Sequence, residues 1–309
     1  MFFSLLIGSS SLKLGVLIDG LMLKESSASQ LVYQLRLPRL LLTLLTGFAV
    51  SVSGFLMQKV SQNNLASPSM LGLVDGAVLG LVLAKFLGIS SSLLLAVFSI
   101  GFSLLSLAVV YGIAALVPGG FLKTRLVLIG IVVGNVIGSL ANLFAYQMSF
   151  FQEVSLYFVG SVTDATWLDV WLMLGTCLLV VPFLVYLLPQ LEGFYLEEEV
   201  LKGLGMPVYR LKIIAFLLAT CLSAVAVSLV GKLGFVGLIV PNLVGLLKIK
   251  GVVSQFMMTS LFGVILLLVA DILAKLIRYP YETPISFVIS LLGLPFFFWL
   301  LKRNGGRHV

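Results

Sequence analysis

The sequence predicts an all-α polytopic membrane protein with about nine or ten transmembrane helices, and three observations lead to this class. Hydrophobic residues make up 60% of the 309-residue chain, and charged residues make up only 10%. The mean hydropathy is +1.19, whereas a soluble domain carries about 25% charged residues. The apolar runs are long and continuous, which excludes the alternating pattern of an outer-membrane barrel.

Nine apolar segments account for the predicted helices, because a helix needs about 20 residues to cross the hydrocarbon layer. In chain order they are 39–58, 70–88, 92–117, 124–148, 169–188, 209–230, 234–248, 256–277 and 284–301. The segment 234–248 is short and contains glycine and proline, so we expect an interrupted helix there. The more polar segment 149–166 is expected to lie at a membrane surface rather than to span the bilayer.

The formal charge of +7 indicates membrane anchoring rather than nucleic-acid binding. Lysines and arginines stand singly or in pairs at the ends of apolar runs, where such residues anchor helices. If the polar connection 189–208 is cytoplasmic, 11 of the 19 basic residues lie on that side and 8 on the other. Because cytoplasmic loops carry the excess of positive charge, this small bias places 189–208 and the C-terminus inside.

The residue sets used by enzymes are missing from the sequence. It contains no G-x-x-x-x-G-K-[ST] loop for a nucleotide phosphate, and its one histidine, His308, lies in the polar tail. Cys177 and Cys221 each stand within an apolar run and are expected to be reduced packing residues. We therefore predict no catalytic residue, no metal site and no directly bound cofactor, and expect a transport subunit rather than an enzyme.

Two carboxylates stand within apolar segments, where ionisable groups mark transport pathways. Asp75 is expected either to cap a helix end, which is the favoured interpretation, or to line a pocket. Asp271 precedes Lys275 by four residues, the spacing at which two side chains meet on one helix face. A transporter driven by an ion gradient is an alternative that these carboxylates leave open.

Two of the apolar segments carry a glycine at every fourth position. Four residues return to nearly the same helix face, so each row forms a groove that another backbone can approach closely. Packing within one subunit is the favoured interpretation, and a subunit interface or a pore lining is the alternative. The rows are Gly72, Gly76 and Gly80, and Gly130, Gly134 and Gly138.

The longest polar connection, 189–208, contains the stretch LEEEVLKGLG. It mixes acidic and apolar residues and ends in glycine, which is typical of a short surface helix. A rigid helix between two spans would suit a lever for a cytoplasmic motor, and a solvated loop is the alternative.

Several ordered motifs resemble those of the permease subunits of ATP-binding-cassette importers for iron-siderophores, haem and cobalamin. RLPR at 36–39 and NNLASPSMLG at 63–72 resemble the family's R-L-P-R and N-P-L-A-x-P-x-L-L-G. GKLGFVGLIVPN at 231–242 resembles G-P-I-G-F-V-G-L-I-V-P-H, and GLPFFFWLL at 293–301 resembles a segment with G-A-P-F-F. The resemblance covers nearly the whole chain and implies the type II importer permease fold in one transmembrane domain, 1–309.

The resemblance also implies two partner surfaces. The stretch 198–205 matches the cytoplasmic helix that couples the permease to its ATPase, and arginines on the external side of family members meet glutamates of a substrate-binding protein. The residues matched to ATPase coupling are Glu198, Glu199, Leu204 and Gly205. The residues matched to binding-protein docking are Arg36, Arg39 and Lys275, with Arg278 beside them.

The implied function is uptake of a metal chelate by alternating access in a bacterial cell membrane. The implied partners are a second permease, two cytoplasmic ATPase subunits that hold ATP and magnesium, and an external binding protein. Ferric siderophore is the first expectation for the chelate, with haem or cobalamin as alternatives. The helices at 124–148 and 284–301 are expected to line the cavity. A secondary transporter and a non-transport membrane scaffold are alternatives of a different class.

Some positions depart from the family pattern. The family's first helix has about twenty residues, whereas only Met1 to Gly8 is apolar here, so 1–38 is expected to be an external segment with a truncated first helix. Lys232 replaces a proline, Asn242 replaces a histidine, and Leu201 replaces a small residue. Such departures favour pairing with an unlike permease over a homodimer.

Overall fold

The computed structural model describes residues 30–120, 122–147, 155, 157–278 and 281–305. Within these ranges each of the nine predicted apolar segments forms one helix, which confirms the all-α class. The helices are α4 (Leu37–Ser61), α5 (Leu73–Phe86), α6 (Ser92–Leu116), α7 (Lys123–Gln147), α9 (Trp167–Leu191), α11 (Val208–Val230), α12 (Val236–Leu246), α13 (Val252–Ile277) and α14 (Ile285–Gly305). Two short elements, η2 (Glu192–Tyr195) and α10 (Glu198–Gly203), connect α9 to α11.

Two of the expected segments lie largely outside the described residues. The expected truncated first helix, Met1 to Gly8, is among them, as is most of the polar segment 149–166. Residues 32–36 of the expected external segment 1–38 form a π-helical turn, η1 (Val32–Arg36), that leads directly into α4. The first described helix therefore begins several residues earlier than the apolar pattern predicts.

In the described part of the chain, six helices are long and apolar enough to cross a membrane, namely α4 with η1, α6, α7, α9, α11 and α13. By contrast, α12 has 11 residues, which corresponds to about 16 Å and to about half of a hydrocarbon layer. It begins after Phe235, whose φ of +63° lies in the left-handed region and turns the chain sharply. The predicted interruption at 234–248 is thus a half-length helix.

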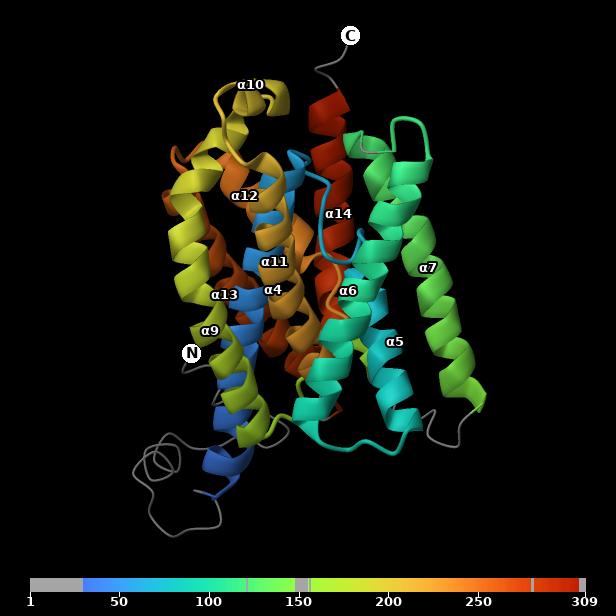
Figure 1. The fold of residues 1–309 in the computed structure, drawn as a ribbon. Coiled ribbons are helices and arrows are strands. Elements are labelled where there is room, and N and C mark those ends of the chain that lie inside the picture. Colours follow the sequence, from blue (N-terminus) through green and yellow to red (C-terminus); the bar gives the residue numbers. More distant parts are fainter. Residues whose placement is uncertain (1–29, 121, 148–154, 156, 279–280, 306–309) are drawn as a thin grey trace.

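α4 lies at the centre of one helix group and is almost entirely buried (Figure 1). Glycines allow its backbone to approach two neighbours closely: a methyl group added at Gly54 would lie 2.0 Å from the carbonyl oxygen of Gly237 in α12. One added at Gly47 would lie 2.6 Å from the carbonyl oxygen of Gly263 in α13. Small residues at such contacts are the usual means of packing helices in lipid, where no hydrophobic effect drives helices together.

A second group consists of α5, α6 and α7, and α11 contacts both groups. Serine hydroxyls fix α6 against α5: Ser103 Oγ donates to the carbonyl of Leu73 at 2.8 Å, and Ser106 Oγ donates to that of Gly72 at 2.7 Å. Hydrogen bonds between helices stabilise packing in a bilayer. The arrangement leaves α10 at one end of the bundle and the N-terminal end of α4 at the other (Figure 1).

Candidate functional site

The helix α10 projects from the end of the bundle between α9 and α11 (Figure 1). Leu201 fixes it, since this side chain is fully buried in the main core. Gly193 of η2 leaves space for Leu201, because a methyl group there would lie 3.0 Å from Leu201 Cδ2. The large residue that replaces a small one at this position therefore anchors the short helix to the bundle.

Glu198 holds α10 to the following helix. Its Oε2 lies 2.5 Å from the ammonium nitrogen of Lys212 in α11, and its Oε1 lies 3.1 Å from that of Lys202. The hydrogen bond from Lys212 lowers the pKa of the Glu198 carboxyl below its ordinary value, and the bond from Lys202 adds to this effect. Glu198 was predicted to contact an ATPase, but in this structure its carboxylate is occupied by these two lysines.

The outer face of α10 is formed by other residues. Glu199 is exposed, as are Val200 and Leu204, the last with 66% of its surface accessible. Gly205 has φ +76°, a left-handed conformation that favours glycine and ends the helix. The predicted coupling residues therefore have different positions. Glu199 and Leu204 lie on the outer face of α10, Gly205 ends the helix, and Glu198 holds the helix to α11.

At the opposite end of α4, the predicted docking residue Arg39 lies in a buried ion-pair cluster. Its guanidinium lies 2.9 Å from Asp271 Oδ1 in α13 and 2.7 Å from Glu282 Oε1 in the connection to α14. Lys275 completes the cluster at 2.6 Å from Asp271 Oδ2, which confirms the predicted i, i+4 pair. Thr163, from the connection between α7 and α9, donates a further hydrogen bond to Glu282 at 2.9 Å.

This cluster changes how the four basic docking candidates are assigned. Arg39 has 11% of its side chain exposed and Lys275 only 6%, so both are held within the chain. Arg278 is exposed at the end of α13, with its guanidinium over the ring of Tyr281 at 5.7 Å. Arg36 is half-buried. Arg278 is thus the most exposed of the four residues.

The two ends of the bundle are separated by about one membrane thickness. Arg39 and Lys59 lie at opposite ends of α4, and their separation along the helix is about 30 Å at 1.5 Å per residue. The hydrocarbon core of a bilayer is also about 30 Å thick. The α10 end and the Arg39 cluster are therefore about as far apart as the two faces of a hydrocarbon layer.

Between these two ends, Lys232 and Asp75 form an ion pair at 2.6 Å. Asp75 stands in the first turn of α5, where a carboxylate is favoured by the helix dipole, but its side chain makes no capping hydrogen bond. Asp75 thus lies at a helix end, as the favoured interpretation expected, but Gly72 is the N-cap and the Asp75 carboxylate pairs with the connection before α12. Lys232 also lies 5.3 Å from the centre of the Phe158 ring.

The glycine row of α7 provides the space for this carboxylate. Methyl groups added at Gly134 and Gly138 would lie 2.9 Å and 3.1 Å from the two carboxylate oxygens of Asp75. One added at Gly130 would lie 2.5 Å from the carbonyl oxygen of Met70. The row therefore packs within the subunit, against α5 and the residues before it.

The glycine row on α5 packs against α6. A methyl group at Gly76 would lie 2.6 Å from the carbonyl oxygen of Phe102, and one at Gly80 would lie 2.5 Å from that of Phe98, both in α6. Gly72 has φ +73° and stands at the N-cap of α5. Both rows thus support the favoured interpretation, packing within one chain.

Sequence reasoning missed the partners of these charges. No role was predicted for Glu282, and Lys232 was noted only as a departure from proline. The available signal was composition, because acidic and basic residues are so few in this chain that buried ones are expected to pair. What the sequence did not show was which elements, distant along the chain, bring them together.

Comparison with known proteins agrees with this architecture. The model of the FecCD transport family matches residues 1–303. The chain belongs to the FecCD transport family. FeuB, an iron-uptake system permease protein of Bacillus subtilis strain 168, is 33% identical over 280 residues, which cover 90% of this chain and 84% of FeuB. BtuC, a vitamin B12 import system permease protein of Pectobacterium atrosepticum, is 34% identical over 283 residues, which cover 88% of this chain and 82% of BtuC.

A solved structure gives the same result for the fold. A metal-chelate type ABC transporter in an inward-facing conformation superposes with a TM-score of 0.81 at 28% identity, covering 97% of this chain and 93% of that one. The fold is thus that of the type II importer permeases, as the sequence resemblance implied. This FecCD family member is a multi-pass membrane permease of the ABC importer type.

Proposed function

We propose that this FecCD family permease imports a ferric chelate by alternating access in a bacterial cell membrane, powered by separate ATPase subunits. The proposal rests mainly on the structure of α10. Leu201 and Glu198 anchor this short helix to the bundle, and Glu199 and Leu204 are exposed on its outer face. A helix held rigidly at its base and exposed at its tip transmits a push from a docked subunit to α9 and α11. The name of FeuB, an iron-uptake permease, supports iron as the cargo.

The opposite end supports docking of a substrate-binding protein. Arg278 offers an exposed guanidinium group and Arg36 is partly exposed, and guanidinium groups form bidentate pairs with carboxylates. The cluster of Arg39, Asp271 and Glu282 lies beside them and fixes the ends of α4 and α13. In this proposal Arg36 and Arg278 contact the binding protein, whereas Arg39 stabilises the structure of the docking surface.

The other partner is a second permease, and an unlike one is favoured over a second copy. Lys232 stands where the family pattern has proline, and it is engaged in an ion pair with Asp75 within this chain. Together with the other departures from that pattern, this specialised internal contact supports an asymmetric pair. Co-purification of two differently tagged copies of this chain would instead establish a homodimer.

Cobalamin is the second candidate for the cargo, because BtuC is named for vitamin B12 import. The substrate-binding protein that docks on this permease decides between the two candidates, since it selects the ligand before docking. Isothermal titration of that binding protein with a ferric siderophore and with cobalamin gives the answer. Tight binding of cobalamin alone would replace iron in the proposal.

The ATPase partnership is tested by co-purification. Substituting Glu199→Arg together with Leu204→Asp changes the exposed face of α10 without touching Leu201 or Glu198, so the permease should fold and lose its ATPase. Lys250→Glu is the matched control, because Lys250 is exposed in the turn between α12 and α13 and is not part of α10. Equal ATPase recovery with the α10 variant and with the control would contradict the proposed role of α10.

A further inference from the structure

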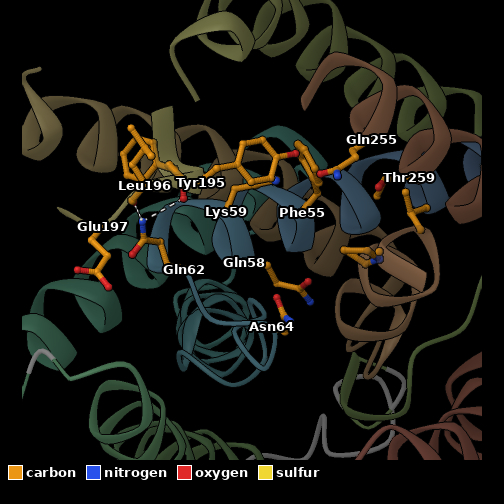
Figure 2. A pocket seen from close by; sticks show the side chains of 14 residues that line it. Phe55, Gln58, Lys59, Gln62, Asn64, Tyr195, Leu196, Glu197, Gln255 and Thr259 are labelled. Carbon is orange, nitrogen blue, oxygen red and sulfur yellow. Dashed lines mark hydrogen bonds between the residues drawn. The ribbon is translucent and has the colours of Figure 1, made fainter. Parts of the chain in front are cut away.

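A polar pocket of about 380 Å³ opens beside the N-terminal end of α10. Figure 2 shows its walls, which come from the C-terminal end of α4, from η2 and the two residues after it, and from α12 and α13. The volume falls in the range of about 300–1,000 Å³ that is typical of ligand sites. The proposed function assigns no role to this pocket.

Lys59 provides the positive charge of the pocket. Its ammonium group lies 3.7 Å from the centre of the Tyr195 ring, so the ring face holds it in place. Among the described residues no carboxylate lies within ion-pair distance of this lysine. Glu197 lines the same pocket and the charge of Glu192 acts on Lys59, but neither carboxylate forms an ion pair with it, so the ammonium group can receive an external anion.

The amide side chains of the pocket show what else the ligand must offer. The Gln62 amide nitrogen donates to the carbonyls of Phe194 and Leu196, at 3.0 Å and 2.6 Å, and the Gln58 amide nitrogen donates to that of Leu238 at 3.3 Å. Both N–H donors of Gln62 are thus occupied, which leaves its amide oxygen as an acceptor, whereas Gln58 keeps one N–H group and its oxygen for a ligand.

A buried hydroxyl adds a second unsatisfied group. Thr259 lines the pocket and is fully buried, and within the described part of the chain its hydroxyl has no hydrogen-bond partner (Figure 2). Buried polar groups without a partner are uncommon and costly. Because no surface of Thr259 is exposed, a ligand would reach this hydroxyl only by displacing the side chains that cover it.

Acceptors beside a cation fit an acidic peptide better than a free phosphate. A peptide loop brings backbone N–H donors for the amide oxygens and a carboxylate for Lys59, whereas a phosphate group offers mainly acceptors. Leu196 and Glu197 line the pocket, and Glu197 is also the N-cap of α10. A subunit that docks on α10 therefore lies beside the pocket.

We propose that this pocket receives an acidic loop of the ATPase subunit that docks on α10, with a carboxylate of that loop paired to Lys59. The inference rests on the proposed function. It adds a second, charge-selective contact to the exposed face of α10. Since charged contacts select between partners more than they add affinity, Lys59 would help to distinguish the correct ATPase from related ones.

The direct test is carbodiimide cross-linking of the purified complex of this permease with its ATPase. The reagent joins an ammonium group to a carboxylate in direct contact, so mass spectrometry should find Lys59 linked to an aspartate or glutamate of the ATPase. The variant Lys59→Arg keeps the charge but does not react, so it should retain the ATPase and lose this link. A link from Lys59 only to Glu192 or Glu197 of the same chain would overturn the proposal.

Affinity provides the second measurement. Lys59→Glu places like charges together and should weaken ATPase binding about tenfold or more, whereas Lys59→Arg should stay within about threefold of the original chain. Lys250→Glu makes the same change of charge at an exposed site outside the pocket and should bind normally. Equal binding by Lys59→Glu and Lys250→Glu would overturn the proposal.

Two results separate this inference from the function on which it rests. If the original chain retains its ATPase and Lys59→Glu does so equally, the pocket contact is wrong and the importer function stands. If the original chain retains no ATPase, the proposed function itself fails. Protection of the pocket by inorganic phosphate, measured as slower acylation of Lys59 in the free permease, would point to a free anion instead and would overturn the peptide assignment.

Discussion

Lys232 and Asp75 join the connection before α12 to the first turn of α5 by an ion pair of 2.6 Å. The two residues are 157 positions apart, and α7 closes over them with a row of glycines. The pair links the start of α5 to the start of the half-length helix α12, and about a quarter or less of each side chain is exposed. It therefore fixes the points at which these two helices begin.

The first prediction concerns the energy of this pair. Asp75→Ala and Lys232→Ala should each lower the melting temperature of the purified permease, because each leaves a partly buried charge without its partner. The double variant should lose less than the sum of the two, with a coupling energy of about 1–2 kcal/mol. Additive losses in this double-mutant cycle would show that the contact contributes nothing to stability.

The glycine row gives the second prediction. Gly134→Ala places a methyl group 2.9 Å from a carboxylate oxygen of Asp75 and 3.1 Å from the Cα atom of Gly72, so we expect a loss of about 1–3 kcal/mol. Gly112→Ala in α6 is the control, because nothing lies within 4 Å of its added methyl group. The control should be neutral or slightly stabilising. Equal melting temperatures for the two variants would contradict the packing described for α7.

The third prediction separates docking from folding at the other end of the bundle. Arg39→Glu puts a third carboxylate beside Asp271 and Glu282, so it should destabilise the protein by about 3 kcal/mol or more. Arg36→Glu should slow uptake with little effect on basal ATPase activity. A stable Arg39→Glu variant, or normal uptake with Arg36→Glu, would refute the corresponding role.

The fourth prediction is a pH dependence of α10. Because the pKa of the folded Glu198 is lowered, its ion pair with Lys212 adds stability at pH values above the ordinary glutamate pKa. This stability is lost as the pH falls through the lowered pKa of the folded state. Hydrogen–deuterium exchange, corrected for the intrinsic effect of pH, should show weaker protection of α10 under acid conditions.

The matched variant for this measurement is Glu198→Gln, which has no titrating carboxylate at that position. Its α10 should be less protected at neutral pH and should respond much less to acid. If the original chain and the variant show the same pH profile, Glu198 does not anchor the helix.

The fold was largely predictable because the bilayer imposes a simple rule on sequence. All nine apolar segments became helices, and most boundaries shifted by only a few residues. The larger shifts arose where local chemistry overrides hydropathy. Residues 32–36 are helical although Arg36 is charged, and α13 begins at Val252, four residues before the apolar pattern suggests.

The site was less predictable, because it depends on contacts between distant segments. The Asp271–Lys275 pair followed from spacing on one helix, and the surface helix at α10 followed from its local pattern. The pairing of Arg39 with Glu282 spans 243 positions, and no local rule connects these residues. For the same reason Asp75 was interpreted as a cap, since its true partner is 157 positions away.

The central claim is that this chain is a permease driven by ATP, and transport into proteoliposomes tests it most directly. The permease would be reconstituted with its partner permease and ATPase, and given the binding protein loaded with a ⁵⁵Fe-labelled siderophore. We expect uptake that requires ATP, persists when proton and sodium gradients are abolished, and is lost with Glu199→Arg and Leu204→Asp on α10. Uptake that proceeds without ATP and follows an imposed ion gradient would contradict it.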